Sequence, residues 1–298
     1  MLIEFLKDKT LTPEIKILET PRDGFQGIAE FIPTQKKIEF INLLLNCGFH
    51  TVEVGSLVSP KAIPQMADTI ELLEKLDYSK TRSRIAVLVA NKSGGKKAMD
   101  FEVINDLIFP FSVSETFLKK NINQGFDEAE KTIDFLQNIC IKNNKQLLPY
   151  LSMGFGNPYG DEWSLEVLHF WTNKFLSKGI KILPVSDIMG EASPEEIGKV
   201  FTSLIKQFPE IEFGLHLHSR KETAIEKIDA AYKTGVRRFD TVLGGLGGCP
   251  MTGKELIGNL NLSTLTDYCE ENEIETGLEV QNLKTTLQLN SKLVNFVR

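Results

Sequence analysis

Two histidines separated by one residue, His216 and His218, stand at the end of a predicted β-strand. Because side chains on a strand alternate between its two faces, both imidazoles point to one face, about 6 to 7 Å apart along the strand. Two imidazoles in this arrangement can bind one divalent cation, and the alternative is a half-buried pair hydrogen-bonded to neighbouring groups. The other two histidines, His50 and His169, lie at a predicted strand start and in a predicted helix.

A glycine-rich segment follows the last predicted strand and reads Gly244-Gly245-Leu246-Gly247-Gly248-Cys249-Pro250. Such a segment lets the backbone approach a ligand closely and lets the chain close over a site. Cys249 is a candidate acid or base, because a cation nearby lowers the pKa of a thiol, although a lone cysteine is more often a buried apolar residue. Asn259, further along, is either an ordinary helix residue or an oxygen ligand.

Polar residues also follow the other predicted strands. Arg22 and Asp23 come after the first strand, where a structural ion pair on a loop is the alternative to a role in a site. The polar residues after strands two, three, five and six are Glu53, Asn91, Ser152, Asn157 and Asp187. Carboxylates, imidazoles and amides gathered at one rim are what a divalent cation with open coordination positions needs.

The elements that position these residues alternate regularly between strand and helix. The predicted strands are Ile15–Glu19, Thr51–Val54, Ile85–Val89, Val103–Phe109, Gln146–Ser152, Lys181–Val185, Glu212–His216 and Arg238–Thr241. Eight alternating β and α units predict parallel strands closed into an α/β (β/α)8 TIM barrel, whose active site lies at the carboxyl ends of its strands. An open doubly wound sheet is the alternative, but it would place a GxGxxG loop after the first strand, and none is there.

Local signals mark where some helices begin. Thr34 is a predicted N-cap, and Ser193-Pro194-Glu195-Glu196 combines an N-cap serine, a proline at the first helical position and a glutamate placed for a capping box. We expect one domain over residues 1–298, with the barrel over about 12–250 and C-terminal helices over about 251–298 that cover it.

Composition excludes several classes of protein. The 298 residues are 42% hydrophobic and 25% charged, as in a folded globular chain, and the net charge of −6 offers no basic surface for nucleic acid. The sequence has no apolar stretch of the roughly 18 residues that a membrane helix needs. Four widely spaced cysteines indicate a reducing compartment, so we expect a cytoplasmic protein, and a homodimer is expected only on base rates for oligomeric proteins.

Taken in order, these motifs resemble the hydroxymethylglutaryl-CoA lyase family, metal-dependent lyases on a TIM barrel with an Arg-Asp pair. Residues 20–26, Thr-Pro-Arg-Asp-Gly-Phe-Gln, look like the family's opening motif, and the segment from Glu53 to Met66 is similar to its second-strand signature. Residues 119–123, Lys-Lys-Asn-Ile-Asn, the His-x-His pair and the glycine-rich segment also fit. The resemblance runs from about Ile15 to Thr276.

The resemblance implies a role for each matching residue. Mg²⁺ or Mn²⁺ would be bound by Asp23, His216, His218 and Asn259. The implied catalytic residues are Arg22, Cys249, Glu53 and Asp187, and the implied substrate-binding residues are Arg22, Gln26, Asn121 and Ser152. Arg22 would stabilise an enolate oxygen, Cys249 would exchange a proton at the forming acetyl carbon, and the two carboxylates would serve in acid–base chemistry and substrate orientation.

The implied reaction is a retro-Claisen cleavage of 3-hydroxy-3-methylglutaryl-CoA to acetyl-CoA and acetoacetate, a step of leucine degradation that needs no redox cofactor. The alternatives are lyases or aldolases of another hydroxyacyl-CoA or hydroxy acid, a Claisen condensing enzyme, and a catalytically silent acyl-CoA-binding protein on the same fold. The chain departs from the family in the sixth-strand segment, which reads Ser186-Asp187-Ile188-Met189-Gly190 where an Asp-Thr-x-Gly pattern is usual, and in residues 27–29 and 219–222.

Overall fold

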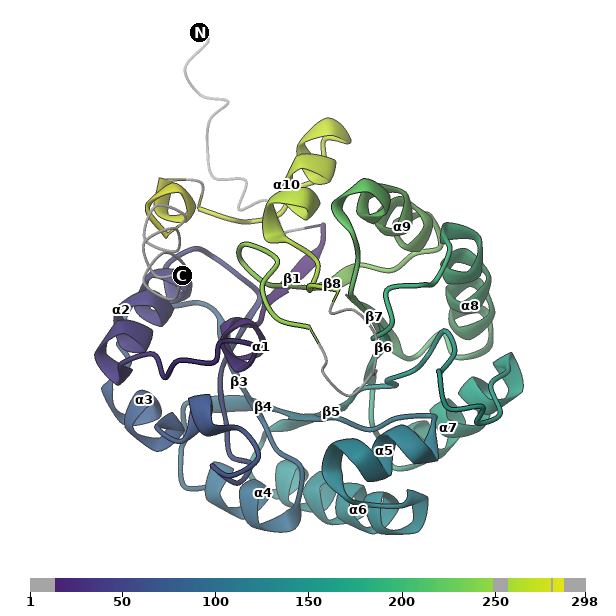
Figure 1. The fold of residues 1–298 in the computed structure, drawn as a ribbon, viewed down its shortest axis with the longest axis horizontal. Coiled ribbons are helices and arrows are strands. Elements are labelled where there is room, and N and C mark those ends of the chain that lie inside the picture. The colour runs from purple at the N-terminus through teal and green to yellow at the C-terminus, as the bar shows by residue number, and fades with distance from the viewer. Residues whose placement is uncertain (1–13, 249–256, 280, 287–298) are drawn as a thin grey trace, which may run out of the picture.

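The computed structural model describes residues 14–248, 257–279 and 281–286. Its strands are β1 (Lys16–Glu19), β2 (Thr51–Ser56), β3 (Arg84–Leu88), β4 (Ile104–Phe109), β5 (Gln146–Pro149), β6 (Ile182–Asp187), β7 (Glu212–Leu217) and β8 (Arg238–Thr241). They are parallel and pair in the order β5-β4-β3-β2-β1-β8-β7-β6. A parallel bridge between Leu151 and Val185 joins the two ends of this sheet, so the strands form the nearly closed barrel in the centre of Figure 1.

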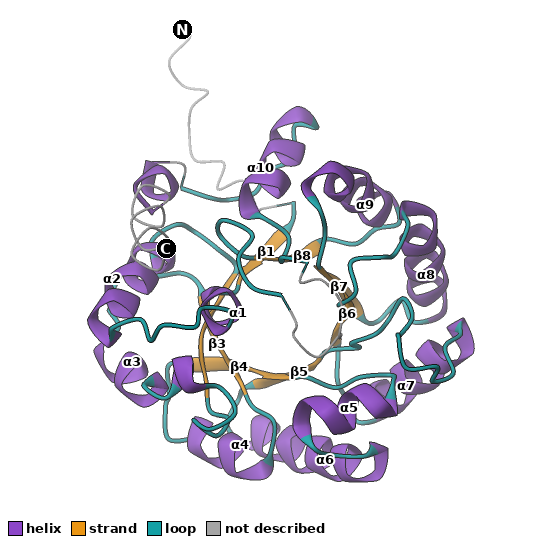
Figure 2. Cartoon of the chain, viewed as in Figure 1, coloured by secondary structure: helices purple, strands orange, loops and turns teal. Residues whose placement is uncertain are grey.

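Helices surround the strands in an outer ring, as the purple and orange elements of Figure 2 show. They are α1 (Pro21–Gln26), α2 (Thr34–Leu45), the 3-10 helix η1 (Pro64–Met66), α3 (Thr69–Lys75), α4 (Lys92–Ala98), α5 (Glu115–Ile122), α6 (Phe126–Lys142), α7 (Leu165–Ser177), α8 (Pro194–Gln207), α9 (Lys221–Lys233) and α10 (Leu262–Glu271). Residues 281–286 are also helical. Among the described helices, none has the length and apolarity to cross a membrane.

The predicted TIM barrel with additional C-terminal helices is confirmed, and each predicted strand overlaps one of β1 to β8. The capping box of α8 is present, because the Ser193 hydroxyl accepts from Glu196 N and the Glu196 carboxylate accepts from Ser193 N. The prediction for Thr34 is wrong. Helix α2 begins at Thr34 itself, and the N-cap is Pro33, which offers no side-chain acceptor.

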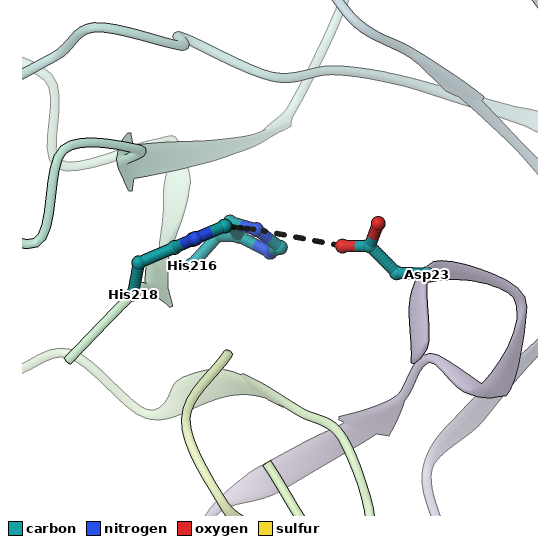
Figure 3. Close-up of side chains that lie close together, drawn as sticks. All are labelled: Asp23, His216 and His218. Carbon is teal, nitrogen blue, oxygen red and sulfur yellow. Dashed lines mark hydrogen bonds and ion pairs between the residues drawn. The ribbon is translucent and has the colours of Figure 1, made fainter. Parts of the chain in front are cut away.

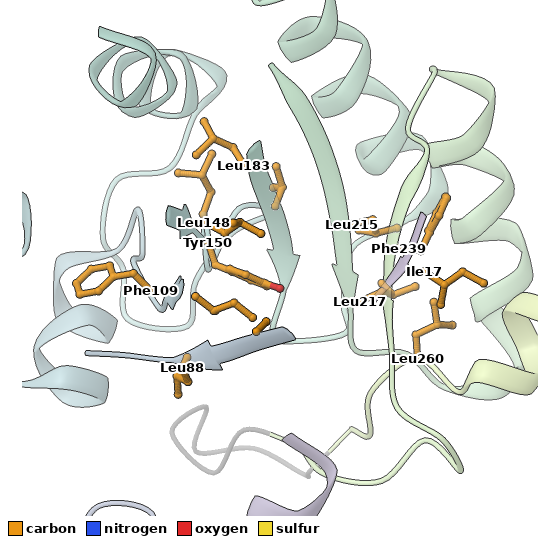
Figure 4. Close-up of a cluster of buried hydrophobic side chains, with 14 of the residues drawn as sticks. Ile17, Leu88, Phe109, Leu148, Tyr150, Leu183, Leu215, Leu217, Phe239 and Leu260 are labelled. Carbon is orange, nitrogen blue, oxygen red and sulfur yellow. The ribbon is translucent and has the colours of Figure 1, made fainter. Parts of the chain in front are cut away.

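Along β7 and β8, apolar and polar side chains alternate between the two faces of the sheet. Leu215, Phe239 and Ile17 are register partners on β7, β8 and β1, and their side chains belong to the buried apolar core (Figure 4). His216 and Asp240, each one residue further along, are also partners and therefore point to the other face. This alternation directs polar side chains of β7 and β8 into the barrel interior.

The C-terminal segment packs against the outer ring. Helix α10 contacts α9, where the Tyr268 ring lies 6.1 Å from the Tyr232 ring and the Tyr268 hydroxyl donates to Asp229. Asn282, within the helical residues 281–286, donates from its amide to Asn46 O at the end of α2. The described C-terminal helices thus lie against the barrel helices.

Candidate active site

A cavity of about 480 Å³ opens at the carboxyl ends of the barrel strands. Most of the predicted site residues line it: Arg22, Asp23, Gln26, Glu53, Asn121, Ser152, His216 and His218. Cys249 lies outside the described residues, although Gly248, which precedes it, lines the cavity. The cavity wall is otherwise partly apolar, with side chains such as Leu88, Ile108 and Ile188.

Arg22 is held rigidly by carboxylates. Its Nε and Nη2 atoms donate to the two Glu53 oxygens at 3.0 and 2.9 Å, and its Nη1 donates to Asp23 at 3.1 Å and to Gln26 at 2.9 Å. Burial raises the pKa of Glu53 to about 7, although the Arg22 charge acts in the opposite direction. The bidentate geometry fixes the plane of the guanidinium and leaves it facing the cavity.

Asp23, His216 and His218 converge on one point, as Figure 3 shows. The Nε2 atoms of the two histidines lie 3.3 Å apart, and Asp23 Oδ2 lies 3.9 Å from His216 Nε2. One ligand atom from each of the three residues lies within 4.8 Å of the others. The predicted metal ligands at the end of β7 and in α1 are therefore adjacent in space.

The second ring nitrogen of each histidine is already occupied. His216 Nδ1 lies 3.1 Å from Asp240 Oδ2 and His218 Nδ1 lies 3.0 Å from Ile257 O, and because both partners accept, each Nδ1 carries the proton. The two Nε2 lone pairs then face each other and the Asp23 carboxylate. Three acceptors directed at one point fit a cation, and a carboxylate and a backbone carbonyl fix the imidazoles as in known metal sites.

Burial and the neighbouring charges shift the pKa of each of the three residues differently. Burial and the neighbouring His216 lower the pKa of His218 to about 4, so His218 is neutral at pH 7. Burial lowers the pKa of His216. The hydrogen bond to Asp240 and the negative charge of Asp240 raise it, and the net shift is upward. Burial would raise the pKa of Asp23, whereas Arg22 and the two histidines lower it, so Asp23 is ionised.

Asn259, the fourth predicted ligand, is buried beside this group. Its backbone forms a bridge with His218, its amide nitrogen donates to Leu246 O at 2.9 Å, and its side chain also hydrogen-bonds Asp23. The glycine-rich segment approaches closely here, because a Cβ added to Gly247 would lie 2.7 Å from the Asn259 amide nitrogen and 2.9 Å from Asp23 O. Only glycine fits at this contact.

Asp187 is placed differently from the other predicted residues. It is the last residue of β6 and is not among the residues that line the cavity. Its Oδ2 accepts from Ala192 N at 3.1 Å and lies 3.5 Å from Lys227 Nζ of α9. Burial raises the Asp187 pKa, and Lys227 opposes that shift. Its contacts fix the loop after β6 to the outer helix.

Tyr150 and Asp240, beside His216, were not predicted as site residues. The Tyr150 hydroxyl, which follows β5, donates at 2.6 Å to Asp240 Oδ2, the same oxygen that contacts His216. Burial raises the Tyr150 pKa well above its ordinary value, with the charge of Asp240 acting in the same direction, so the hydroxyl keeps its proton. Asp240 is the third residue of β8, and its polarity inside a buried strand was the available signal.

Known proteins share this arrangement of the chain. The HMGL-like family model matches residues 14–289. Hydroxymethylglutaryl-CoA lyase YngG of Bacillus subtilis (strain 168) is 32% identical over 263 residues, covering 88% of this chain and 87% of the relative. The solved HMG-CoA lyase of Bacillus subtilis aligns with a TM-score of 0.89 and 30% identity over 95% of each chain. That of Acinetobacter baumannii, in complex with coenzyme A and 3-methylmalate, aligns with a TM-score of 0.86 and 28% identity over 95% of this chain and 91% of that one.

The region of similarity to these proteins includes both the barrel and the cavity. The matched residues include every described residue of the converging group and of the Arg22 network, and the chain spans most of the length of each relative. The protein therefore belongs to the HMGL-like family and is an enzyme of this carbon–carbon lyase family.

Proposed function

We propose that this enzyme cleaves 3-hydroxy-3-methylglutaryl-CoA to acetyl-CoA and acetoacetate with the help of Mg²⁺ or Mn²⁺. The observation that carries the proposal is the convergence of the His216 and His218 Nε2 atoms and the Asp23 carboxylate beside a guanidinium that faces the same cavity. A cation site next to a fixed positive charge suits a reaction in which an alkoxide and then an enolate develop.

Asp23, His216, His218 and Asn259 would hold the metal. Carboxylate and amide oxygens together with imidazoles suit Mn²⁺ or Mg²⁺ with positions left for substrate oxygens. When bound, the cation supplies Lewis-acid polarisation of the substrate hydroxyl and carboxylate and lowers the pKa of that hydroxyl. Asp240 supports the group by keeping His216 in the tautomer whose Nε2 is free.

The acid–base steps would use residues around Arg22. Glu53, with a pKa of about 7, accepts the proton of the tertiary hydroxyl. The carbon–carbon bond then breaks to leave a ketone, and its electron pair passes into an acetyl-CoA enolate whose oxygen Arg22 stabilises. Cys249 donates a proton to the enolate carbon, and the position of Gly248 at the cavity wall supports this role.

The remaining cavity residues would bind the rest of the substrate. Gln26 lies against Arg22, and Ser152 and Asn121 line the cavity at the β5 and α5 sides. The Acinetobacter baumannii relative binds coenzyme A together with a hydroxy acid, which supports an acyl-CoA substrate here. Asp187 would act only through the loop after β6, because its contacts lie outside the cavity.

The cell compartment and assembly belong to the same proposal. Cys47, Cys140 and Cys269 are buried free thiols, which supports a reducing compartment such as the cytoplasm. We also propose that the protein forms a homodimer and acts in leucine degradation.

The test is acetyl-CoA release from 3-hydroxy-3-methylglutaryl-CoA by purified protein, with Mn²⁺ or Mg²⁺ and again with a chelator. We expect metal-dependent release that is lost in Cys249→Ala and kept in the matched Cys140→Ala, whose thiol is buried in α6. No release by folded, metal-loaded protein would reject this substrate, and other hydroxyacyl-CoA thioesters and hydroxy acids would then be assayed in the same way.

A further inference from the structure

The hydroxyl of Ser186 is buried and unpaired. Ser186 is fully buried in β6, and its Oγ atom has no hydrogen-bond partner within the described part of the chain. A buried hydroxyl without a partner costs free energy, and a bound ligand or an ordered water can supply the missing hydrogen bond. Unlike most buried serines of this chain, Ser186 also lines the cavity.

The sheet register places Ser186 beside the candidate metal ligands. Ser186 pairs with His216 across β6 and β7, and His216 pairs with Asp240 across β7 and β8. Register partners in a parallel sheet point to the same face and are close neighbours, so the Ser186 hydroxyl lies next to the His216 ring inside the barrel. A ligand held on the Nε2 atoms of the two histidines comes within reach of this wall.

Alternation along β6 explains which residues face that ligand. Ser186 and Ile188 line the cavity, whereas Asp187 between them contacts Ala192 and Lys227 on the outer side. The β6 side of the cavity therefore offers one hydroxyl and one branched apolar side chain. A wall of this kind accepts a head group with both an oxygen and an apolar substituent.

We propose that Ser186 is a substrate-binding residue whose hydroxyl hydrogen-bonds an oxygen of the metal-chelating hydroxy-acid head of the substrate. The inference rests on the proposed function for the site's location and extends it to the basis of specificity. A site that hydrogen-bonds a substrate oxygen rejects an analogue that lacks it, because the buried hydroxyl is then left unpaired.

The experiment compares Ser186→Ala with wild type by calorimetry on Mn²⁺-loaded protein, using free 3-hydroxy-3-methylglutarate and free malate as probes. We expect roughly tenfold weaker binding of at least one probe, with Mn²⁺ affinity unchanged. The matched control is Thr172→Val, which also removes a buried and unpaired hydroxyl, but from α7 and away from the cavity. We expect the control to bind both probes like wild type.

The outcomes separate this inference from the proposed function. If wild type cleaves the CoA thioester and Ser186→Ala binds both probes normally, the inference is wrong, and the hydroxyl serves the barrel interior, for example through a water shared with Asp240 Oδ1. Loss of Mn²⁺ affinity in Ser186→Ala would also overturn it, because Ser186 would then act through His216. Weakened binding of malate by an enzyme that does not cleave the thioester would support Ser186 and reject the substrate.

Discussion

His216 and His218 present their Nε2 atoms to each other at 3.3 Å, while Asp240 and Ile257 O occupy the opposite ring nitrogens. When His216 is neutral, neither Nε2 carries a proton, and both lone pairs face the Asp23 carboxylate, whose Oδ2 lies 3.9 Å from His216 Nε2. A cation that binds these three groups only in the folded chain raises the stability of the fold.

We expect Mn²⁺ at about 100 times its Kd to add about 2.7 kcal/mol to the free energy of unfolding, which is a rise in Tm of roughly 5 °C. A chelator reverses the rise, and His216→Ala abolishes it. His169→Ala is the control, because His169 contacts Ser203 between the outer helices α7 and α8. A thermal shift of equal size in His216→Ala would place the metal elsewhere.

Substitution of Arg22 is expected to affect both turnover and stability, and the two effects can be measured separately. Arg22→Gln removes the charge that faces the cavity, so we expect kcat to fall by about 10²- to 10³-fold. It also leaves the buried Glu53 carboxylate unpaired, which is expected to lower the free energy of unfolding by about 3 kcal/mol.

The double variant Arg22→Gln/Glu53→Gln provides the control. With no unpaired charge left, we expect most of the lost stability to return in urea unfolding, while kcat stays at least as low as in Arg22→Gln. If Arg22→Gln kept full activity, Arg22 would not be the enolate stabiliser, whatever its effect on stability.

Much of this site was readable from the sequence because its residues follow simple local rules. The alternation of strand side chains placed His216 and His218 on one face, and the position of Arg22 and Asp23 after the first strand placed them at the same rim. The eight strand periods were enough to predict the barrel. No such rule links Tyr150 to Asp240, which lie 90 residues apart and meet only because the sheet closes on itself.

The orientation of Asp187 could not be predicted from the sequence, because it depends on where the sixth strand ends. The sixth strand was predicted to end at Val185, with Asp187 in the following loop and free to face the site. In the structure β6 continues to Asp187, so its side chain points opposite to Ser186 and meets Lys227. Because β6 continues two residues beyond its predicted end, the alternation of strand side chains, and not the geometry of a loop, decides the orientation of Asp187.

Lys227→Met tests whether Asp187 acts through the loop after β6. If the ion pair only positions that loop, Lys227→Met and Asp187→Asn raise KM by similar factors, and the double variant is no worse than either single one. Steady-state kinetics of the three variants measure this. A large loss of kcat in Asp187→Asn alone would instead show direct participation in the reaction.

Glu19 makes stability depend on pH. Its carboxylate is fully buried and accepts from the Thr241 hydroxyl and from Leu243 N, at the start of the glycine-rich segment. Burial raises the Glu19 pKa from 4.5 to about 8, with both hydrogen bonds opposing that shift. Between these two values the folded chain holds a proton that the unfolded chain has lost, so rising pH disfavours folding.

Relative to Glu19→Gln, we therefore expect the wild-type free energy of unfolding to fall by up to about 1.4 kcal/mol per pH unit between pH 5 and 8. Glutamine can accept from Leu243 N and donate to Thr241, so the variant keeps both contacts. Urea unfolding with a chelator present, at pH 6 and pH 8, measures the difference without metal effects. Parallel pH profiles for the two proteins would show that Glu19 has an ordinary pKa.

Substitution of Gly247 tests whether the glycine-rich segment must lie close to the proposed metal ligands. It has φ +91°, and an added Cβ would press on the Asn259 amide nitrogen and on Asp23 O. Gly160 is the matched control, because it also has positive φ, +77°, but nothing lies within 4 Å of an added Cβ. Alanine at either position costs about 1 kcal/mol of stability through backbone strain, measurable by urea unfolding.

Only Gly247→Ala displaces two of the proposed ligands, so we expect Mn²⁺ affinity to fall at least tenfold in that variant and to stay unchanged in Gly160→Ala. Competition against a fluorescent metal chelator measures both affinities. Equal Mn²⁺ affinity in the two variants would mean that the segment can move away without disturbing Asp23 and Asn259. The glycines would then be needed only for the segment to close over the cavity. The proposed metal ligands would be held in place by α1 and by the His218–Asn259 bridge.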